Sequence, residues 1–414
     1  MQAKKIIVVG AGPAGMMASI RAAELGANTT LIEKNPTFGI KLLLSGKGRC
    51  NITNAASLES FLKRFSKNGE FLRDAFKKFF NQDLIEFFEK RGLRMKVERQ
   101  LRVFPDTDKS SSVLDVLTRE LEEKKVKILS KASLKEVLVQ GEKVKGVLLE
   151  NGTRIEAERV ILATGGATFK FTGSSEESFN IVKIIGHTIV PLRPGLVALE
   201  TKEKYPKKLE GLTLKNIKLK FSSDGERIIS EIGELLFTDF GISGPLVLSL
   251  SGKIIDWLSE GKAVYLGIDL KPALSVQQLN ARLLREFSLN PKKIIKNALK
   301  EMLPLNLIKV FLEIADINPM LQVSQISKQQ REKISFLLKN FGLTISRSRP
   351  MQEAMVTRGG VLLKEINPRT MESRLIKGLY FAGEMIDLDA DTGGFNLQAA
   401  FSTGYLAGES AALN

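Results

Sequence analysis

The sequence predicts an α/β protein with a discontinuous, doubly wound parallel sheet that two inserted modules interrupt. Three observations predict this class. The chain opens with a buried strand, a glycine-rich turn and a helix. A later buried strand ends in Ala-Thr-Gly, and strand-like, glycine-rich sequence returns near the C-terminus after a long stretch of different character. Strands that alternate with helices in this way are typical of parallel sheets.

The N-terminal segment predicts a βαβ unit. Residues 5–9 (KIIVV) predict a buried strand, residues 14–26 predict a helix with small residues on its packing face, and residues 29–33 predict the next strand. The turn between the first strand and the helix has the sequence Gly10-Ala11-Gly12-Pro13-Ala14-Gly15.

This G-x-G-x-x-G turn predicts a pyrophosphate site. Gly10 is expected to make the tight turn, Gly12 to let the backbone approach the phosphates, and Gly15 to let the helix pack on the strand. Unpaired amides at the positive helix end would then face the anion. Glu33 ends the second strand and is followed by Lys34. The Glu33 carboxylate is expected to accept hydrogen bonds from ribose hydroxyls, and Lys34 is included in the same predicted site.

The rest of the N-terminal half predicts helices followed by short strands. Residues 57–92 contain eight phenylalanines at helical spacing and predict amphipathic helix. Ser110 to Ser112 predict the cap of a helix that reaches about Lys124. Alternating apolar and polar residues predict the strands of a small meander at 126–130, 136–139, 144–149 and 153–156. A second buried strand is predicted at 159–163.

The character of the sequence changes after Pro191. Short alternating segments from about 195 to 270 predict an antiparallel barrel or sandwich, and the helical pattern from about 275 to 342 is broken only by prolines. A buried strand at 379–382 and a final helix from about Asn396 resume the first pattern. The predicted organisation is therefore an N-terminal part of the cofactor domain (1–192), a β-barrel-like insertion (193–274), a helical insertion (275–345) and the C-terminal part of the cofactor domain (346–414).

Composition narrows the class of protein. A single cysteine, Cys50, excludes an intramolecular disulfide framework and points to a reducing compartment, and a single histidine, His187, argues against a histidine metal centre. Glycines interrupt the apolar N-terminus, and no stretch is long enough to span a bilayer, so the expected location is cytoplasmic and the expected partners include no membrane. The net charge of +16 is spread along the chain, as on a solvated surface, with nucleic-acid contact as the alternative reading.

Two later motifs favour FAD over NAD as the bound dinucleotide. One is Ala163-Thr164-Gly165 at the end of a buried strand, and the other places Gly383 and Glu384 just beyond residues 379–382. Glu384 is expected to hold the ribityl or diphosphate region. Three such signals in this order are typical of two-part FAD folds, so the sequence predicts non-covalent FAD.

The last helix is predicted to begin at about Asn396. The predicted cofactor-binding residues at its start are Gly394, Phe395, Asn396 and Leu397. Its N-terminus, aimed at the flavin pyrimidine carbonyl, would stabilise the negative charge of reduced flavin. Ordinary helix capping by Asn396 is a compatible reading. The sequence has no second G-x-G-x-x-G between a strand and a helix, so NAD(P)H would act only as a transient reductant.

Longer motifs resemble one family. Residues 41–54 (KLLLSGKGRCNITN) look like the signature loop of the BaiN/aminoacetone-oxidase-like flavoproteins, and so do residues 186–199, 233–245 and 359–401. The resemblance covers essentially the whole chain. It implies a FAD-binding domain interrupted by a β-barrel-like and a small helical module, with the adenine near the backbone of Leu134. It also implies that one loop wraps the diphosphate and flavin through Lys41, Leu42, Ser45, Gly46, Arg49, Cys50 and Asn51.

Some positions depart from that family's pattern. Members usually carry His where Asp239 stands, Pro near Lys170, and a Gly-Asp-Gly-like turn where residues 176–178 stand. We expect these departures to affect which substrate is bound more than whether the cofactor is bound. The polar candidates for orienting a substrate are Arg49, Arg358, Lys170 and Asp239. Cys50 is interpreted as a structural or flavin-lining thiol and His187 as a packing residue, and the sequence assigns no catalytic acid or base.

The leading functional hypothesis is a FAD-dependent oxidoreductase that exchanges a hydride between flavin N5 and a small organic substrate or NAD(P)H. Two directions stay open: reduction of an activated C=C or ketone-conjugated system, and oxidation of a small amine with O₂. A second hypothesis, motivated by the charge, is a flavoprotein that modifies tRNA or another nucleic acid. A third is a flavin-binding protein without turnover, in which the turn at 176–178 blocks access.

Overall fold

The computed structural model describes residues 3–169, 172–173 and 176–414. The chain forms two compact units, one made of Met1–Gly195 with Pro350–Asn414 and one made of Leu196–Arg349. Each unit has its own cluster of buried hydrophobic side chains. Within the described ranges, no helix is long and apolar enough to cross a membrane.

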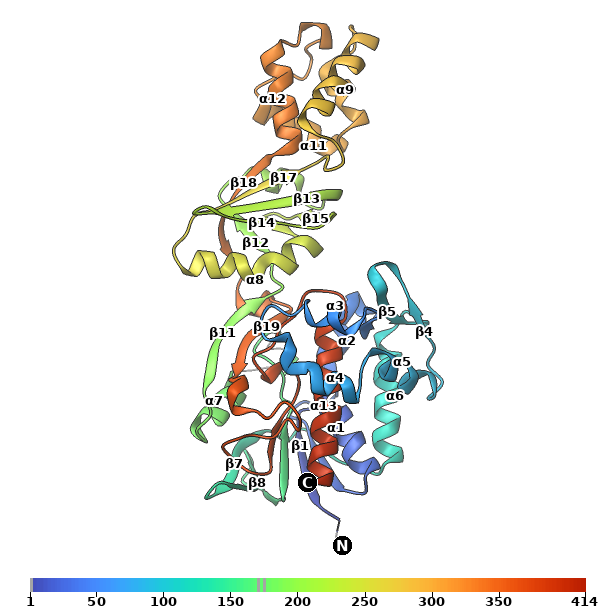
Figure 1. Cartoon of the computed structure of the whole chain (residues 1–414), viewed down its shortest axis with the longest axis vertical. Coiled ribbons are helices and arrows are strands. Elements are labelled where there is room, and N and C mark those ends of the chain that lie inside the picture. Colours follow the sequence, from blue (N-terminus) through green and yellow to red (C-terminus); the bar gives the residue numbers. More distant parts are fainter. Residues whose placement is uncertain (1–2, 170–171, 174–175) are drawn as a thin grey trace. The chain divides into compact units, whose positions relative to one another are not determined.

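A five-stranded parallel sheet is the centre of the first unit (Figure 1). Every neighbouring pair in it is parallel, which confirms the predicted fold class. The strand order reverses beside the first strand, so a crevice is expected outside the carboxyl ends there. In spatial order the strands are β20 (Leu379–Phe381), β10 (Arg159–Leu162), β1 (Lys5–Val9), β2 (Asn28–Ile32) and β6 (Lys127–Leu129).

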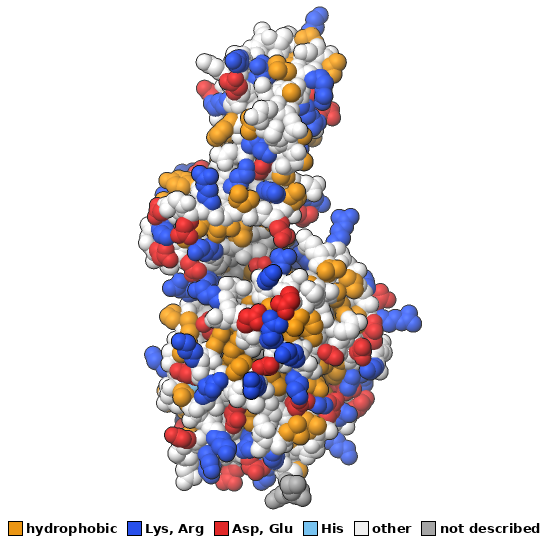
Figure 2. Space-filling model, viewed as in Figure 1, with side chains coloured by type: hydrophobic (Ala, Val, Ile, Leu, Met, Phe, Trp, Pro, Cys, Tyr) orange, Lys and Arg blue, Asp and Glu red, His pale blue; other side chains and the backbone are white. Residues whose placement is uncertain are grey.

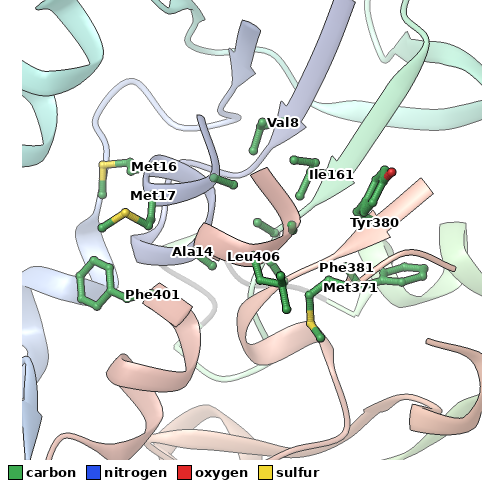
Figure 3. Close-up of a cluster of buried hydrophobic side chains, with 14 of the residues drawn as sticks. Val8, Ala14, Met16, Met17, Ile161, Met371, Tyr380, Phe381, Phe401 and Leu406 are labelled. Atoms are coloured by element: carbon green, nitrogen blue, oxygen red, sulfur yellow. The ribbon is translucent and has the colours of Figure 1, made fainter. Parts of the chain in front are cut away.

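Helices and a second sheet cover this parallel sheet. The longest helix, α13 (Phe395–Leu413), packs along α1 (Pro13–Glu24), and α6 (Ser110–Glu123) packs beside α1. Side chains from β1, α1, β10, β20 and α13 meet in the buried cluster of Figure 3. A three-stranded antiparallel sheet contacts β10, and α7 (Glu177–Ile184) contacts its first strand; its strands are β7 (Leu134–Gln140), β8 (Lys143–Leu149) and β9 (Arg154–Glu156). Residues 127–129, predicted as part of this meander, belong instead to the parallel sheet because they pair with β2.

The prediction of amphipathic helix over 57–92 was wrong. Asn68 has a φ of 55° and Phe79 is extended, and both interrupt the helix. The breaks let rings distant in sequence meet, with Phe61 5.2 Å from Phe76 and 4.7 Å from Phe395 in edge-to-face contacts. Three short helices result: α3 (Leu58–Leu62), α4 (Arg73–Lys78) and α5 (Asn81–Glu89).

The predicted serine cap before α6 was also wrong. Lys109 is the N-cap residue, and the Ser110 hydroxyl donates to the Leu43 carbonyl at 2.9 Å. Ser110 therefore ties α6 to the preceding helix α2 (Ile40–Leu44) instead of closing its own first turn. The remaining strands of this unit form two small antiparallel sheets: β3 (Thr53–Asn54), β5 (Arg102–Pro105) and β4 (Met95–Val97), and the pair β11 (Ile189–Gly195) and β19 (Val356–Val361).

The second unit is built on an antiparallel sheet that closes on itself. The neighbour order runs β13-β15-β16-β12-β18-β17, and β17 pairs back with β13. β14 (Glu226–Ile229) adds to β13 outside this ring. The ring strands are β12 (Leu199–Thr201), β13 (Thr213–Ser223), β15 (Gly233–Phe237), β16 (Gly241–Ser243), β17 (Val264–Asp269) and β18 (Phe341–Ser348).

Helices interrupt and follow these strands. The sequence analysis missed α8 (Pro245–Ser259), which starts at a proline after Gly244 and buries Trp257. The helical segment predicted to follow contains four α-helices, and its buried side chains belong to the same hydrophobic cluster as those of the ring. They are α9 (Val276–Leu289), α10 (Ile295–Ala298), α11 (Leu305–Ala315) and α12 (Lys328–Lys339).

The contact between α1 and α13 gives the first testable prediction. A Cβ at Gly408 would lie 2.3 Å from the Ala18 carbonyl oxygen, so Gly408→Ala is expected to destabilise the first unit by about 1–3 kcal/mol, against the usual gain from Gly→Ala in a helix. The measurement is thermal unfolding followed by far-UV circular dichroism. Gly342→Ala is the control, because no atom lies within 4 Å of a Cβ built there. An unchanged or raised Tm for Gly408→Ala would contradict the close packing.

Candidate cofactor and active site

The carboxyl ends of four neighbouring parallel strands lie side by side. Backbone bonds link them in order: the Gly10 amide donates to Ile32, the Ala163 amide to Val9, and the Ala382 amide to Leu162, at 2.8 to 3.0 Å. The segments that leave these strands are the predicted cofactor motifs, residues 10–15, 33–34, 163–165 and 383–384. The fold thus brings together residues that lie up to 374 positions apart (10 to 384).

The first helix presents an open, uncapped N-terminus. Gly10 has a φ of 103°, and a Cβ there would lie 2.4 Å from the Ala163 oxygen. A Cβ at Gly15 would lie 1.8 Å from the Gly10 oxygen, whereas nothing lies within 4 Å of one at Gly12. α1 has no side-chain cap, and Pro13 has no amide hydrogen. The amides of Ala14 and Gly15 therefore face space that an anion can fill.

Glu33 fixes the loop beside this helix end. Its carboxylate accepts the Ala11 amide at 2.8 Å and the Asn35 amide at 2.9 Å. Its carbonyl accepts the Ala132 amide at 2.9 Å, so the chain leading to Leu134 passes next to it. Lys34 lies beside Gly173, since a Cβ on that glycine would be 3.2 Å from the lysine Cε. The roles of Glu33 toward a ribose and of the Leu134 backbone toward an adenine stay predictions.

Lys41 and Glu384 join in a polar network that the sequence did not show. The Lys41 ammonium donates to Glu384 at 2.5 Å and to the Thr168 hydroxyl at 2.8 Å. The other Glu384 oxygen accepts the Thr357 amide at 2.8 Å, and the Thr357 hydroxyl accepts the Ala167 amide at 2.7 Å. The network links α2, the end of β10, β19 and the segment after β20.

The loop after α2 is compact. Leu42 is buried, and its carbonyl accepts the Ser45 hydroxyl at 2.6 Å. Gly46 has a φ of 56°, and a Cβ there would lie 2.8 Å from the Asn51 amide nitrogen. Cys50 is fully buried with a φ of 60°, and burial raises the pKa of its thiol to about 12. The thiol is therefore held protonated, as expected of a lining or packing group.

Arg49 is held by two acidic side chains and an aromatic ring. Its guanidinium pairs with Glu98 and Asp108 at 2.5 Å each and lies 4.2 Å from the centre of the Phe104 ring. These hydrogen bonds hold the pKa of Arg49 above its usual value. The predicted contact of Arg49 with the cofactor remains a proposal, and the side chain would have to leave these partners to make it.

The last helix offers a second uncapped N-terminus. Gly394 is its N-cap residue with a φ of 98°, and no side chain caps the helix. Asn396 is not a cap: its side chain exchanges two hydrogen bonds with Ala390, both of 2.9 Å, and so holds the preceding loop. Phe395 is buried in the aromatic cluster. The amides of residues 395–397, Leu397 included, have no partner inside the helix.

Thr53 and Asn54 lie against the start of α13, and the sequence analysis did not name them. A Cβ at Gly394 would lie 2.3 Å from the Thr53 carbonyl oxygen, and the Asn54 side chain donates to Gly393 at 3.1 Å. In the described part of the chain, Asn51 Oδ1 and Thr53 Oγ1 are buried without a hydrogen-bond partner. The only sequence signal was the row of polar residues in NITN. Open space at Gly12, two uncapped helix ends and two unpartnered polar atoms together fit a bound dinucleotide with a polar ring edge.

The candidate substrate residues belong to different elements of the chain. Arg358 is buried on β19, with its Nε 3.7 Å from an oxygen of Asp389. Burial and the neighbouring Asp389 raise the pKa of Asp387, two positions earlier. Asp239 is exposed on the turn after β15 in the other unit. Lys170 lies outside the described residues.

His187 is placed as a packing residue. Its Nε2 lies 2.8 Å from the Ser373 hydroxyl, and its ring meets Phe381 edge to face. Burial lowers the pKa of the imidazole, so it is neutral at pH 7. Among the described residues, no group of three or more His, Cys, Asp or Glu is arranged to hold a metal ion.

Known proteins resemble this chain along nearly its whole length. A family model described as the HI0933-like protein Rossmann domain matches residues 4–410. A 3-dehydro-bile acid delta(4,6)-reductase from Clostridium scindens is 33% identical, over 99% of each chain. A ribosomal RNA dihydrouridine synthase from Haemophilus influenzae is 29% identical, over 96% of each chain. The crystal structure of a 3-ketosteroid delta1-dehydrogenase from Sterolibacterium denitrificans covers 100% of both chains with 13% identity and a TM-score of 0.53, a likeness of fold.

Gly12 gives a prediction that separates binding from folding. Because nothing lies within 4 Å of a Cβ at this position, Gly12→Val should fold normally while its side chain fills the space a pyrophosphate needs. We expect at least a hundredfold loss of FAD affinity, on the order of 3 kcal/mol or more, measured by flavin fluorescence titration alongside Tm. Gly342→Ala is the control for expression and handling, because nothing lies within 4 Å of a Cβ there and its backbone is not left-handed. A yellow, FAD-saturated Gly12→Val protein would refute the assignment.

Cys50 gives a prediction about reactivity. With its pKa raised to about 12, the thiol should be about one part in ten thousand thiolate at pH 8, and it is also buried. Iodoacetamide is therefore expected to leave the native protein unmodified over hours, as read by intact mass. The same protein in guanidinium should take up one label per chain, since Cys50 is its single cysteine. Rapid stoichiometric labelling of the native protein would mean that Cys50 is accessible and ionised.

Proposed function

Because the chain belongs to the HI0933-like family of FAD-dependent Rossmann-fold proteins, we propose that it reduces a carbon–carbon double bond conjugated to a carbonyl in a small organic substrate. The family is one of FAD-dependent oxidoreductases, and its assignment confirms the resemblance read from the signature loop. The observation that carries the proposal is the full-length relationship to a bile acid reductase, 33% identical over 99% of each chain. The sequence left two reaction directions open. The relationship to a reductase favours reduction of a double bond over oxidation of an amine.

The residues of this chain would bind and orient the cofactor. When bound, the flavin supplies a hydride at N5. The α1 amides would hold the diphosphate, and Glu33 would hold the adenosine ribose. The α13 amides would stabilise negative charge on the ring, which favours the reduced cofactor. The Lys41–Glu384 pair would fix the strand ends around the ribityl chain.

The electron donor in this proposal is NAD(P)H. The sequence has one dinucleotide fingerprint, which FAD would occupy, so the nicotinamide would visit the open flavin face and leave before the substrate enters. This order of events predicts kinetics in which reduction of the cofactor and reduction of the substrate are separate half-reactions.

A second candidate is reduction of a uracil ring in RNA. It has two supports: the 29% identity to a ribosomal RNA dihydrouridine synthase over 96% of each chain, and the net charge of +16. Against it, basic and acidic side chains are mixed on the face shown in Figure 2, without one continuous basic tract. Nucleic acid that co-purifies at low salt and is released at high salt would favour this candidate.

The test is an anaerobic half-reaction series on the purified holoprotein. We expect NADH or NADPH to bleach the flavin absorbance, and a steroid 4-en-3-one to restore it faster than a saturated 3-oxosteroid of the same skeleton. The saturated steroid is the matched control because it lacks only the double bond. Reoxidation by uridine-containing RNA but by no enone would select the second candidate. If neither NADH nor NADPH reduced the flavin, the reductase proposal would be contradicted, and small amines would be the substrates to test next.

A further inference from the structure

Asp387 lies on the segment between two parts of the predicted cofactor site, Glu384 and the start of α13. On one side of it, the Glu384 carboxylate accepts the Thr357 amide at 2.8 Å. On the other side, the Asn396 side chain exchanges two hydrogen bonds with Ala390, both of 2.9 Å. The segment is therefore anchored at both ends. Asp387 is half-buried, so part of the residue is open to solvent and to small molecules.

Two glycines of β19 bring their backbone against Asp387. The Asp387 amide donates to the Val361 carbonyl at 3.2 Å, and the Gly359 amide donates to the Asp387 carboxyl group. A Cβ at Gly360 would lie 2.4 Å from the Met385 carbonyl oxygen and 3.1 Å from the Asp387 amide nitrogen. Gly359 has a φ of 85° and Gly360 a φ of 140°, which favour glycine. Asp387 is therefore held in place by backbone contacts that a side chain at position 360 would prevent.

The charged groups around Asp387 come from three elements. Asp389 is on the same segment, Lys67 is in the loop after α3, and Arg358 is on β19. Asp389 is itself held, because Arg358 Nε lies 3.7 Å from its carboxylate and the Ser66 hydroxyl donates to it at 2.6 Å. Burial and then the negative charge of Asp389 raise the pKa of Asp387, and they outweigh the opposing effects of the two cations.

Such a carboxyl group costs stability near neutral pH. The folded protein binds a proton at Asp387 more tightly than the unfolded chain does. Its contribution to stability is therefore complete below the unfolded pKa and is lost as the pH rises through the folded pKa. Glu200 shows the opposite arrangement, since a hydrogen bond from Arg347 lowers its pKa. A carboxyl group that keeps its proton beside a reaction site is suited to general-acid catalysis.

The proposed reaction needs a proton as well as a hydride. Hydride addition to the β-carbon of an enone leaves an enolate, and a proton must then be added at the α-carbon to give the saturated ketone. The single histidine, His187, is buried against Ser373, and the single cysteine, Cys50, is fully buried. Neither is placed to donate a proton to a substrate.

We propose that Asp387 is the general acid that protonates the α-carbon of the substrate. Its O–H bond breaks, a C–H bond forms at the α-carbon, the enolate electrons restore the carbonyl, and the Asp387 carboxylate regains its proton from water. Asp389, held by Arg358 and Ser66, is the positioning residue whose charge keeps the proton on Asp387. This inference rests on the proposed function and adds the acid that the sequence did not assign.

The first experiment measures the two half-reactions of Asp387→Asn holoprotein under anaerobic conditions. Reoxidation of the reduced flavin by a steroid 4-en-3-one should slow by at least about a hundredfold, because the proton donor is lost. Reduction by NAD(P)H and reoxidation by ferricyanide should keep their wild-type rates, because neither protonates a carbon atom. Asp115→Asn is the matched control, since it makes the same change on the exposed face of α6.

The second experiment follows the enone half-reaction with pH. In wild type its rate should fall by about tenfold per pH unit above the pKa of Asp387, because the acid loses its proton. Asp389→Asn removes the neighbouring charge, so the pKa of Asp387 should drop and the fall should begin at lower pH. A purely structural role for these residues would not move this limb of the profile.

The third experiment needs no turnover. Asp387→Asn should have a higher Tm than wild type at pH 8, because it removes a charge that burial and Asp389 disfavour. The difference should disappear near about pH 4, where the wild-type carboxyl is protonated in both states. Asp115→Asn should show no such pH-dependent gain.

The outcomes separate this proposal from the proposed function. Wild-type reoxidation of Asp387→Asn by the enone, or an equal or lower Tm at pH 8, would overturn the assignment of the acid and leave the reductase proposal intact. A wild-type protein that no enone reoxidised would overturn the proposed function itself. If Asp387→Asn did not fold, the pH profiles of wild type and Asp389→Asn would decide, and profiles that coincide would overturn the assignment.

Discussion

Close backbone contact between the first helix and its neighbours is the constraint on which the cofactor unit depends. Gly15 packs against the Gly10 carbonyl, Gly10 against Ala163, and Gly404 and Gly408 of α13 against carbonyls of α1, each at distances that no Cβ could occupy. These contacts fix the start of α1 over the carboxyl ends of the sheet. They also set the position of α13 along α1, and with it the second helix start at Gly394.

The site follows from this arrangement because each of its parts is anchored to a strand end or a helix end. The segments after β1, β2, β10 and β20 leave the same edge of the sheet, and backbone bonds between neighbouring strand ends keep them in register. Lys41, Glu384 and Thr357 then tie the surrounding loops with charge-assisted hydrogen bonds. In the described part of the chain, Asn51 Oδ1 and Thr53 Oγ1 are buried without a hydrogen-bond partner. A preorganised site of this kind needs little rearrangement to receive a dinucleotide.

The inserted unit is stabilised by closure of its antiparallel sheet into a ring. Its ring of strands is completed by β18, which follows the helical segment, so strands separated by more than 70 residues close the sheet (Asp269 to Phe341). Closure leaves no unpaired edge in the ring, and β14 alone extends beyond it. The helices share their hydrophobic cluster with the ring, which explains why the β and helical segments form one compact unit.

The sequence by itself determined the local motifs: the βαβ unit, the glycine turn, Glu33 at a strand end and the family of the chain. Each depends on residues close in sequence, where spacing and glycine stereochemistry are decisive. Tertiary structure decided how the short helices of residues 57–92 pack, since Phe61 meets Phe76 and Phe395 across the breaks. It also decided that Arg49 pairs with Glu98 and Asp108, that residues 127–129 join the parallel sheet, and that Thr53 lies against Gly394. These depend on partners tens to hundreds of residues away, and no local pattern encodes which distant group a side chain will meet.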